Sequence, residues 1–160
     1  MGRTLIDTNN IFLLKFCWEA AGCYLYTMNI NEIINEVAQI IDSGEIVYVH
    51  RETGEILSFP DLDQAGDEYD YLMQEVMDIV DMAPESYIRF RPLSSSESFK
   101  VMEGFADTVN NDTHVEKIRG ALRERKPFRA FREAVEDLDL LDSWYDYKMA
   151  YLEMMVRDQF

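Results

Sequence analysis

Cysteine is scarce in this chain of 160 residues, which holds only Cys17 and Cys23. Two cysteines do not make a disulfide framework, and no further Cys or clustered His completes a zinc set around them. A reducing compartment suits such a chain, so we expect a cytoplasmic location.

No apolar run reaches the roughly 18 residues of a membrane-spanning helix. The segment 11–26 comes nearest, and Lys15 and Glu19 interrupt it. We therefore expect no membrane partner.

Basic residues are also few. The chain has 15 Lys and Arg against 31 Asp and Glu, which leaves a net charge of −16. This balance favours solubility and disfavours non-specific binding to nucleic acid or anionic lipid. Two interpretations of the acid remain: it solvates a surface, or it faces a basic partner as a nucleic-acid mimic does.

Catalytic and metal-binding motifs are missing as well. His50 and His114 fall at a hairpin and at a helix start, where a surface role fits better than a general base. The sequence has no Gly-x-Ser-x-Gly elbow, phosphate-binding Gly-Lys-Ser/Thr loop or His-Glu-x-x-His pair. The acidic cluster that begins at Asp61 departs from the calcium-loop spacing, because its fifth position is Ala65 and its twelfth is Leu72. We therefore predict no catalytic residue, cofactor or metal site, and we favour a protein that is not an enzyme.

What the chain does have is a clear periodicity of apolar residues. Steps of three and four indicate helices, and β-branched or alternating runs beside turn residues indicate strands. Strands early in the chain and helices late favour an α+β fold with a helical C-terminal half. We expect a small antiparallel sheet, a hairpin plus a third strand, packed on one face by helices. The predicted elements are a helix over 30–43, strands over 46–50 and 55–59, a helix over 67–82, a strand over 87–91, and helices that begin near 94, 113, 127 and 142.

Local signals set several of the element ends. Gly44 is expected to end the first helix in the left-handed conformation. Ser94 with Glu97 forms a capping-box pattern, and Thr113 with Glu116 forms another before the next helix. These signals predict two of the C-terminal helix starts.

Two aromatic rows lie in the last two helices. Phe128 and Phe131 are three apart, so we expect both to pack inward. Trp144 and Tyr147 likewise share a row that faces the core. Tyr145 falls off that row and is expected to be exposed, where an aromatic residue can anchor an interface.

The length indicates one domain. The amphipathic pattern begins just after Met28, so we expect a single α+β domain over 28–160. Residues 1–27 are then an N-terminal extension, poorly ordered or upstream of the natural start. The alternative is a helix over 10–26 that docks on the domain.

The charge is unevenly distributed along the chain. Residues 28–86 hold 15 acids and one base, and the densest acid lies over 61–85. Residues 117–132 hold seven bases and one acid, interleaved with aromatic residues, a pattern that occurs in nucleic-acid binding. The expected acidic face comprises Asp67, Asp70, Glu75 and Asp78. The expected interaction face comprises Lys126, Arg129, Arg132 and Tyr145.

An ordered set of short segments is similar to a known family. The segments are Tyr48-Val49, Glu52-Thr53-Gly54, Tyr87-Ile88, Pro127-Phe128-Arg129-Ala130-Phe131 and Trp144-Tyr145. Over roughly residues 30–157 the set resembles a widespread bacterial family of small acidic proteins that is catalogued only as an uncharacterised protein family. Its hallmark is Phe-Arg-x-Phe ahead of a Trp-Tyr pair. The resemblance implies a bacterial protein that starts near residue 28, and it implies no activity.

The predicted function is a non-enzymatic protein-interaction or regulatory module of the bacterial cytosol with a protein partner. The alternatives are a nucleic-acid mimic that uses the acidic face of 61–85, a carboxylate-based enzyme, and a nucleic-acid binder that uses 117–132. The net charge disfavours the last of these. The acidic and basic segments also suit each other, within one chain or between two copies as a homo-oligomer.

Overall fold

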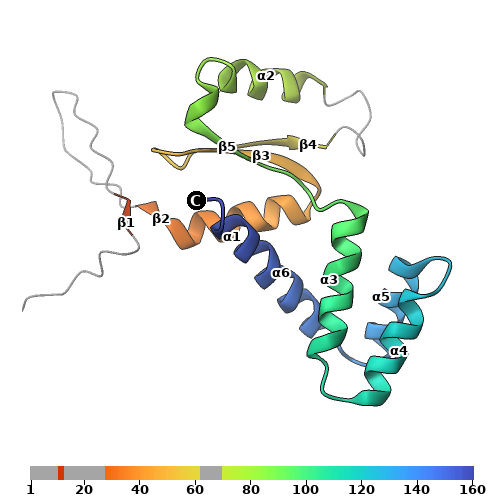
Figure 1. The fold of residues 1–160 in the computed structure, drawn as a ribbon. Helices are drawn as coiled ribbons and strands as arrows, with labels where there is room; N and C mark the ends of the chain where they lie inside the picture. Colours follow the sequence, from red (N-terminus) through yellow and green to blue (C-terminus); the bar gives the residue numbers. More distant parts are fainter. Residues whose placement is uncertain (1–10, 13–27, 62–69) are drawn as a thin grey trace, which may run out of the picture. The chain divides into compact units, whose positions relative to one another are not determined.

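The computed structural model describes residues 11–12, 28–61 and 70–160. Over these residues it holds a three-stranded antiparallel sheet and six helices, and its C-terminal half is helical (Figure 1). This arrangement confirms the predicted α+β class. The described part of the chain has no helix that is both long and apolar enough to span a bilayer.

The chain forms two compact units. The sheet unit comprises Met1–Pro92 with Gln159–Phe160, and the helical unit comprises Leu93–Asp158. The acidic excess lies mainly in the first of them. Residues 28–92 hold 15 acids and three bases, whereas residues 93–158 hold 14 acids and ten bases. The expected extension over 1–27 lies outside the described residues, except for strand β1 (Ile11–Phe12), which pairs with β2 (Met28–Asn29).

Three strands make the central sheet, in the order β4-β3-β5. They are β3 (Glu45–His50), β4 (Ile56–Pro60) and β5 (Tyr87–Phe90), and β3 is antiparallel to both neighbours. The predicted hairpin and third strand are confirmed. Gly54 has a φ of 65° in the turn, a conformation that suits glycine. Pro60 closes β4 at the edge of the sheet, where its missing N–H costs no ladder bond.

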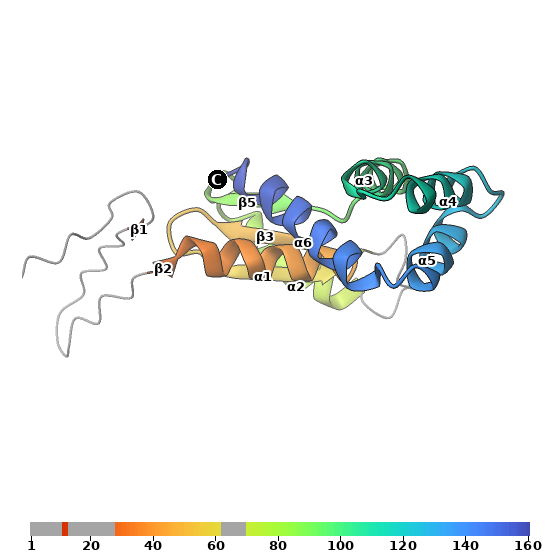
Figure 2. The same cartoon turned by 90° about the horizontal axis from the view of Figure 1, so that it is seen from below.

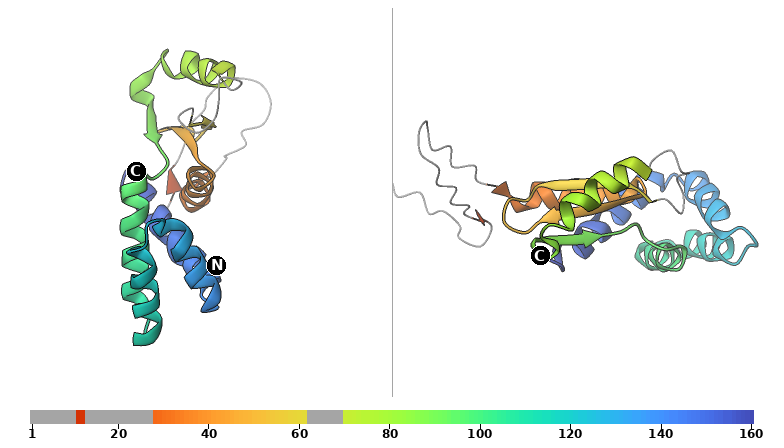
Figure 3. Two further views of the ribbon diagram at one scale, coloured as in Figure 1. Left: turned by 90° about the vertical axis from the view of Figure 1, so that its right-hand side faces the viewer. Right: turned by 90° about the horizontal axis from the view of Figure 1, so that it is seen from above.

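Helices cover both faces of this sheet (Figures 1 and 3). α1 (Ile30–Asp42) contacts β3, and α2 (Asp70–Val80) contacts β4 from the other side. Successive strand residues point to opposite faces, so Val47 and Val49 pack away from Tyr48, and all three are buried. The expectation that helices cover one face is therefore corrected: the uninterrupted apolar run of β3 reflects burial on both sides.

The ends of α1 agree with the sequence, and α2 turns one large apolar residue outward. Asn29 Oδ1 accepts a hydrogen bond from Asn31 N at 3.1 Å, and Gly44 follows the helix with a φ of 94°. In α2, Val76 and Val80 are buried. Ile79 is 40% exposed, because it lies about 100° around the helix from Val80. The predicted start of this helix at 67 lies outside the described residues.

Four helices build the helical unit (Figure 2): α3 (Ser95–Thr108), α4 (Asp112–Leu122), α5 (Pro127–Asp137) and α6 (Leu141–Arg157). α4 packs against α3 and α5, and α6 contacts α3 and α5. The buried side chains between them are Met102, Phe105, Ala106, Ile118, Leu122, Phe131 and Val135. One apolar core therefore joins all four helices.

Two helix starts test the predicted caps. Ser94 Oγ accepts from Glu97 N at 3.3 Å and Ser94 N donates to Glu97 Oε2 at 2.8 Å, which confirms the capping box of α3. The predicted cap of α4 at Thr113 is wrong. Asn111 directly precedes the first helical residue, and its Oδ1 accepts from the backbone amides of Thr113 and His114 at 3.0 and 3.2 Å.

Candidate functional site

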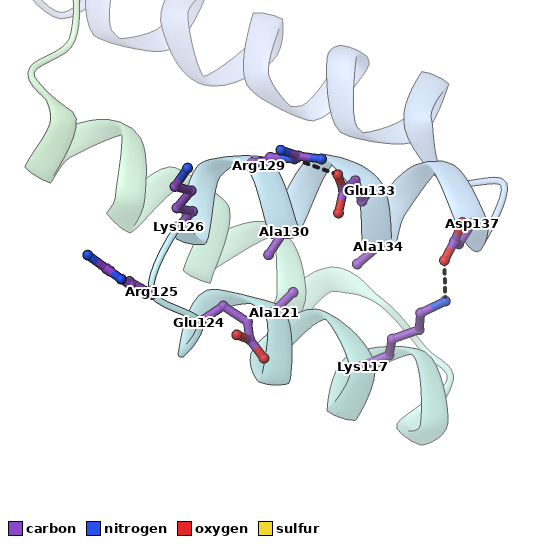
Figure 4. Close-up of a pocket in the computed structure, with 10 residues that line it drawn as sticks. All are labelled: Lys117, Ala121, Glu124, Arg125, Lys126, Arg129, Ala130, Glu133, Ala134 and Asp137. Atoms are coloured by element: carbon purple, nitrogen blue, oxygen red, sulfur yellow. Dashed lines mark hydrogen bonds and ion pairs between the residues drawn. The ribbon is translucent and has the colours of Figure 1, made fainter.

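A groove of about 560 Å³ runs between α4 and α5 (Figure 4). Ala121 on α4 and Ala130 on α5 point toward each other in it, and Ala134 lies one turn further along α5. These methyl side chains are too short to fill the space between the helices, so the groove stays open above them. The lining residues are Lys117, Ala121, Glu124, Arg125, Lys126, Arg129, Ala130, Glu133, Ala134 and Asp137.

The two ends of the groove differ in charge. At one end, Lys117 Nζ forms an ion pair of 3.0 Å with Asp137 Oδ2 across the two helices. At the other end, Arg125 and Lys126 occupy the loop that joins α4 to α5 (Figure 4), and neither has an ion partner among the described residues. One end of the groove is therefore closed by a neutralised pair, and the other is cationic.

Along the wall of α5, Arg129 Nε donates a hydrogen bond of 2.7 Å to Glu133 Oε1, one turn away. The hydrogen bond and the negative charge of Glu133 raise the pKa of Arg129 above its ordinary value. The shift does not change the charge of this guanidinium near neutral pH, because an arginine is always protonated there. The pair also holds Arg129 over the groove.

Four of the seven bases of the segment 117–132 have no ion pair with any residue that the structure describes. Lys117, Arg119 and Arg129 pair with acids of the helical unit, and Arg119 Nη2 lies 2.6 Å from Asp107 Oδ1. The acids that pair with these three bases all lie outside the segment 61–85. The bases without an ion partner among the described residues are Arg123, Arg125, Lys126 and Arg132.

The structure separates the four residues of the expected interaction face. Lys126 and Arg129 line the groove, whereas Arg132 and Tyr145 are exposed and do not line it. Arg132 lies one turn after Phe128 on α5, on the flank away from the groove alanines. The sequence did not single out Arg125 or the alanines of the floor. Small residues on two consecutive amphipathic helices were the available signal.

The segments Phe128–Phe131 and Trp144–Tyr145 each contain one aromatic residue that packs on the core, buried in Phe131 and partly buried in Trp144, and one that is exposed. Phe131 is 1% exposed, and its ring centroid lies 4.8 Å from that of Trp144. Phe128 and Tyr145 are each 44% exposed. The predicted exposure of Tyr145 is confirmed, and the inward position predicted for Phe128 is wrong. Core packing therefore accounts for Phe131 and Trp144 and leaves Phe128 and Tyr145 on the surface.

The expected acidic face is described in part. Glu75 and Asp78 are exposed on α2, and Asp78 Oδ1 accepts a hydrogen bond of 2.6 Å from Gln74 Nε2. Asp67 lies outside the described residues. Asp70 is the first residue of α2, and its side chain is not described.

The remaining candidates for chemistry are the histidines and clusters of possible metal ligands, and of these His50 has a structural role. His50 Nδ1 accepts from the backbone amides of Glu52 and Thr53 at 3.3 and 3.2 Å, so this ring organises the β3–β4 turn. Within residues 28–61 and 70–160, no three His, Cys, Asp or Glu side chains gather as a metal site would require. No polar or charged side chain of the described residues is buried.

The chain matches the model of a family described as an uncharacterised protein family, UPF0158, over residues 25–158. The chain belongs to this family. A UPF0158 protein of Pseudomonas aeruginosa is 31% identical over 71 residues, which are 44% of this chain and 46% of that protein. The match thus spans about half the length of that relative. No solved structure gives a significant match. The resemblance recognised in the sequence is confirmed, and the family's description names no activity.

Proposed function

We propose that this chain is a protein-interaction module that binds an acidic segment of a partner protein along the α4–α5 groove. The observation that carries the proposal is the open cationic end of the groove, where Arg125 and Lys126 have no acid partner among the described residues. A charged partner gains specificity and association rate from such a surface.

The physical gain comes from several modest contributions. Each exposed ion pair contributes about 0.2–1 kcal/mol, so the affinity needs several pairs together. An arginine can add a bidentate contact to a carboxylate.

The start of α5 adds to the positive character of this end. Pro127 is its first residue, and the side chain of Lys126, the residue before it, makes no capping hydrogen bond. Free amides and the helix dipole place partial positive charge there. A carboxylate of the partner can therefore cap α5 while it pairs with Lys126.

Net charge does not prevent this association. At physiological ionic strength, charges further than about 8 Å from the partner are largely screened. A partner in the groove therefore senses mainly the groove lining, which holds four bases and three acids. Two of these bases, Lys117 and Arg129, are paired with Asp137 and Glu133, so the local positive charge lies at the end formed by Arg125 and Lys126. The total of −16 acts chiefly at long range.

The groove walls favour protein over nucleic acid. Glu124, Glu133 and Asp137 line the groove together with the bases. A nucleic acid brings a phosphate at every nucleotide and is repelled by these carboxylates, and its affinity depends mainly on charge neutralisation. A protein segment can place acids opposite Arg125 and Lys126 and neutral or basic side chains elsewhere.

The test compares two variants with the same substitution. The protein is tagged in its native host, and Lys126→Glu is compared with Lys100→Glu, an exposed base on α3 that does not line the groove. We expect Lys126→Glu to lose a specific acidic protein that the wild type and Lys100→Glu retain. Equal recovery from all three would refute the groove as the binding site. Loss of a nucleic acid in place of a protein would favour the nucleic-acid alternative.

A further inference from the structure

We infer that the acidic segment bound by the groove is helix α2 of a second copy of this chain. The inference rests on the proposed function, because it names the partner of the same groove. Both surfaces are present in every molecule, so association needs no other protein.

The outward side of α2 is acidic and apolar at once. Tyr71, Glu75, Asp78 and Ile79 recur at helical steps on α2 and are exposed, and the exposed Met82 follows in the turn after the helix. Tyr71 is 65% exposed, Ile79 is 40% exposed and Met82 is 83% exposed. Large apolar side chains at such exposure along one helix face indicate a contact surface.

No base of the same helix neutralises this surface. Residues 70–82 contain neither Lys nor Arg. Glu75 has no ion pair among the described residues, and Asp78 is bonded to the neutral Gln74. The two carboxylates are therefore available to the bases of another molecule.

The groove offers the complementary set. Arg125 and Lys126 have no ion partner among the described residues at its open end, and Ala121, Ala130 and Ala134 lie along its floor. Each surface thus combines unpaired charge of one sign with apolar side chains. Burial of Tyr71 and Met82 against alanines and aliphatic stems would supply the apolar part of the contact.

The lengths of the elements also agree. α2, α4 and α5 each have 11 residues, about 16 Å at 1.5 Å per residue. A helix of this length laid along the α4–α5 groove forms a third member of a helical bundle, as amphipathic helices do in recognition grooves.

The contact joins two different surfaces. The groove of one copy binds α2 of another copy. If each of two copies binds the α2 of the other, the assembly is a closed dimer. If each copy binds the α2 of a further copy, the assembly grows into a chain of molecules. Because two copies of net charge −16 repel at long range, the association is measured at physiological ionic strength, where screening acts beyond about 8 Å.

The experiment is a charge swap followed by sedimentation analysis of the full chain. Lys126→Glu changes the groove, and Glu75→Arg changes α2. Each variant alone should weaken self-association about tenfold, because an attraction becomes a repulsion. An equimolar mixture of the two should recover association, since the reversed groove of one copy now fits the reversed helix of the other.

Two controls carry matched substitutions away from both surfaces. Lys100→Glu on α3 and Glu116→Arg on α4 are exposed and do not line the groove. We expect both to associate as the wild type does. Recovery in the mixture also shows that neither single variant failed by misfolding.

The outcomes separate this inference from the proposed function. A wild type that stays monomeric at every concentration, or a mixture that does not recover association, overturns the inference. If an acidic host protein is still lost from Lys126→Glu in that case, the groove remains an interaction site for another partner. If nothing is lost either, both proposals fail.

Discussion

Two helical glycines of the helical unit should respond to alanine in opposite directions. Gly104 lies on α3 where the side chain of Tyr147 on α6 approaches the backbone. A Cβ at position 104 would lie 2.6 Å from Tyr147 Oη, whereas a Cβ at Gly120 on α4 would meet nothing within 4 Å. The same substitution therefore tests packing at one site and helix propensity alone at the other.

The magnitudes follow from this geometry. Non-bonded heavy atoms prefer about 3.5–4.0 Å, so Tyr147 or the α3 backbone must move by about 1 Å in Gly104→Ala. The ring of Tyr147 packs on Phe105 at 5.6 Å and on Trp144 at 6.4 Å between centroids, which resists the movement. Overpacking costs about 1–3 kcal/mol, and the helix gains about 0.5–1 kcal/mol from alanine. We expect a net loss of about 1 kcal/mol for Gly104→Ala and a gain of about 0.5–1 kcal/mol for Gly120→Ala.

Urea unfolding followed by far-ultraviolet circular dichroism measures these changes in the free energy of unfolding. Adding Tyr147→Phe to Gly104→Ala should recover the loss, because the next atom of the ring, Cζ, lies at an ordinary 3.7 Å from the position that the alanine Cβ takes. Tyr147→Phe alone should change stability by less than about 0.5 kcal/mol. Stabilisation by Gly104→Ala equal to that by Gly120→Ala would refute the close approach of α3 and α6.

Four other substitutions test local features by the same unfolding assay. Phe131→Ala should cost about 3–5 kcal/mol because its ring is buried, whereas Phe128→Ala should cost less than about 1 kcal/mol, and equal losses would contradict the assigned burial. Ser94→Ala should cost about 1 kcal/mol through loss of the capping box, and an unchanged midpoint would contradict that role. His50→Ala should cost about 1 kcal/mol, because the turn amides lose their acceptor, and increased amide exchange at Glu52 and Thr53 would locate the effect.

Features that depend on neighbouring residues could be predicted from the sequence. The capping box at Ser94 and the left-handed Gly44 each involve a few consecutive residues, so the local chemistry decides them. The capping residue of α4 was harder to predict, since Asn111 and Thr113 both carry a side-chain oxygen that can accept hydrogen bonds from backbone amides. The choice between them depends on where the helix begins, which periodicity fixes only to within a few residues.

Features that depend on two distant segments were predicted less well. The β3 run suits a strand buried on one face or on both, and only the placement of α1 and α2 decides between them. The groove is a similar case. Its charges stand out in the sequence, but nothing in the sequence shows that Ala121 on one helix faces Ala130 on the next. The candidate site could therefore be predicted as a charged segment and not as a shape.

Phe128 and Phe131 show how the same pattern can serve two purposes. The two residues are three positions apart, so their side chains lie about 60° from each other around the helix axis. One apolar face of the helix can therefore include both. Phe131 instead meets Phe105 and Trp144 in the core, while Phe128, in the first turn of α5, stays 44% exposed. Core packing is thus assigned to Phe131 and surface exposure to Phe128, although the two rings belong to one short segment. Phe128→Ala should leave the fold intact, and a loss of more than about 1 kcal/mol in the free energy of unfolding would show that Phe128 belongs to the core after all.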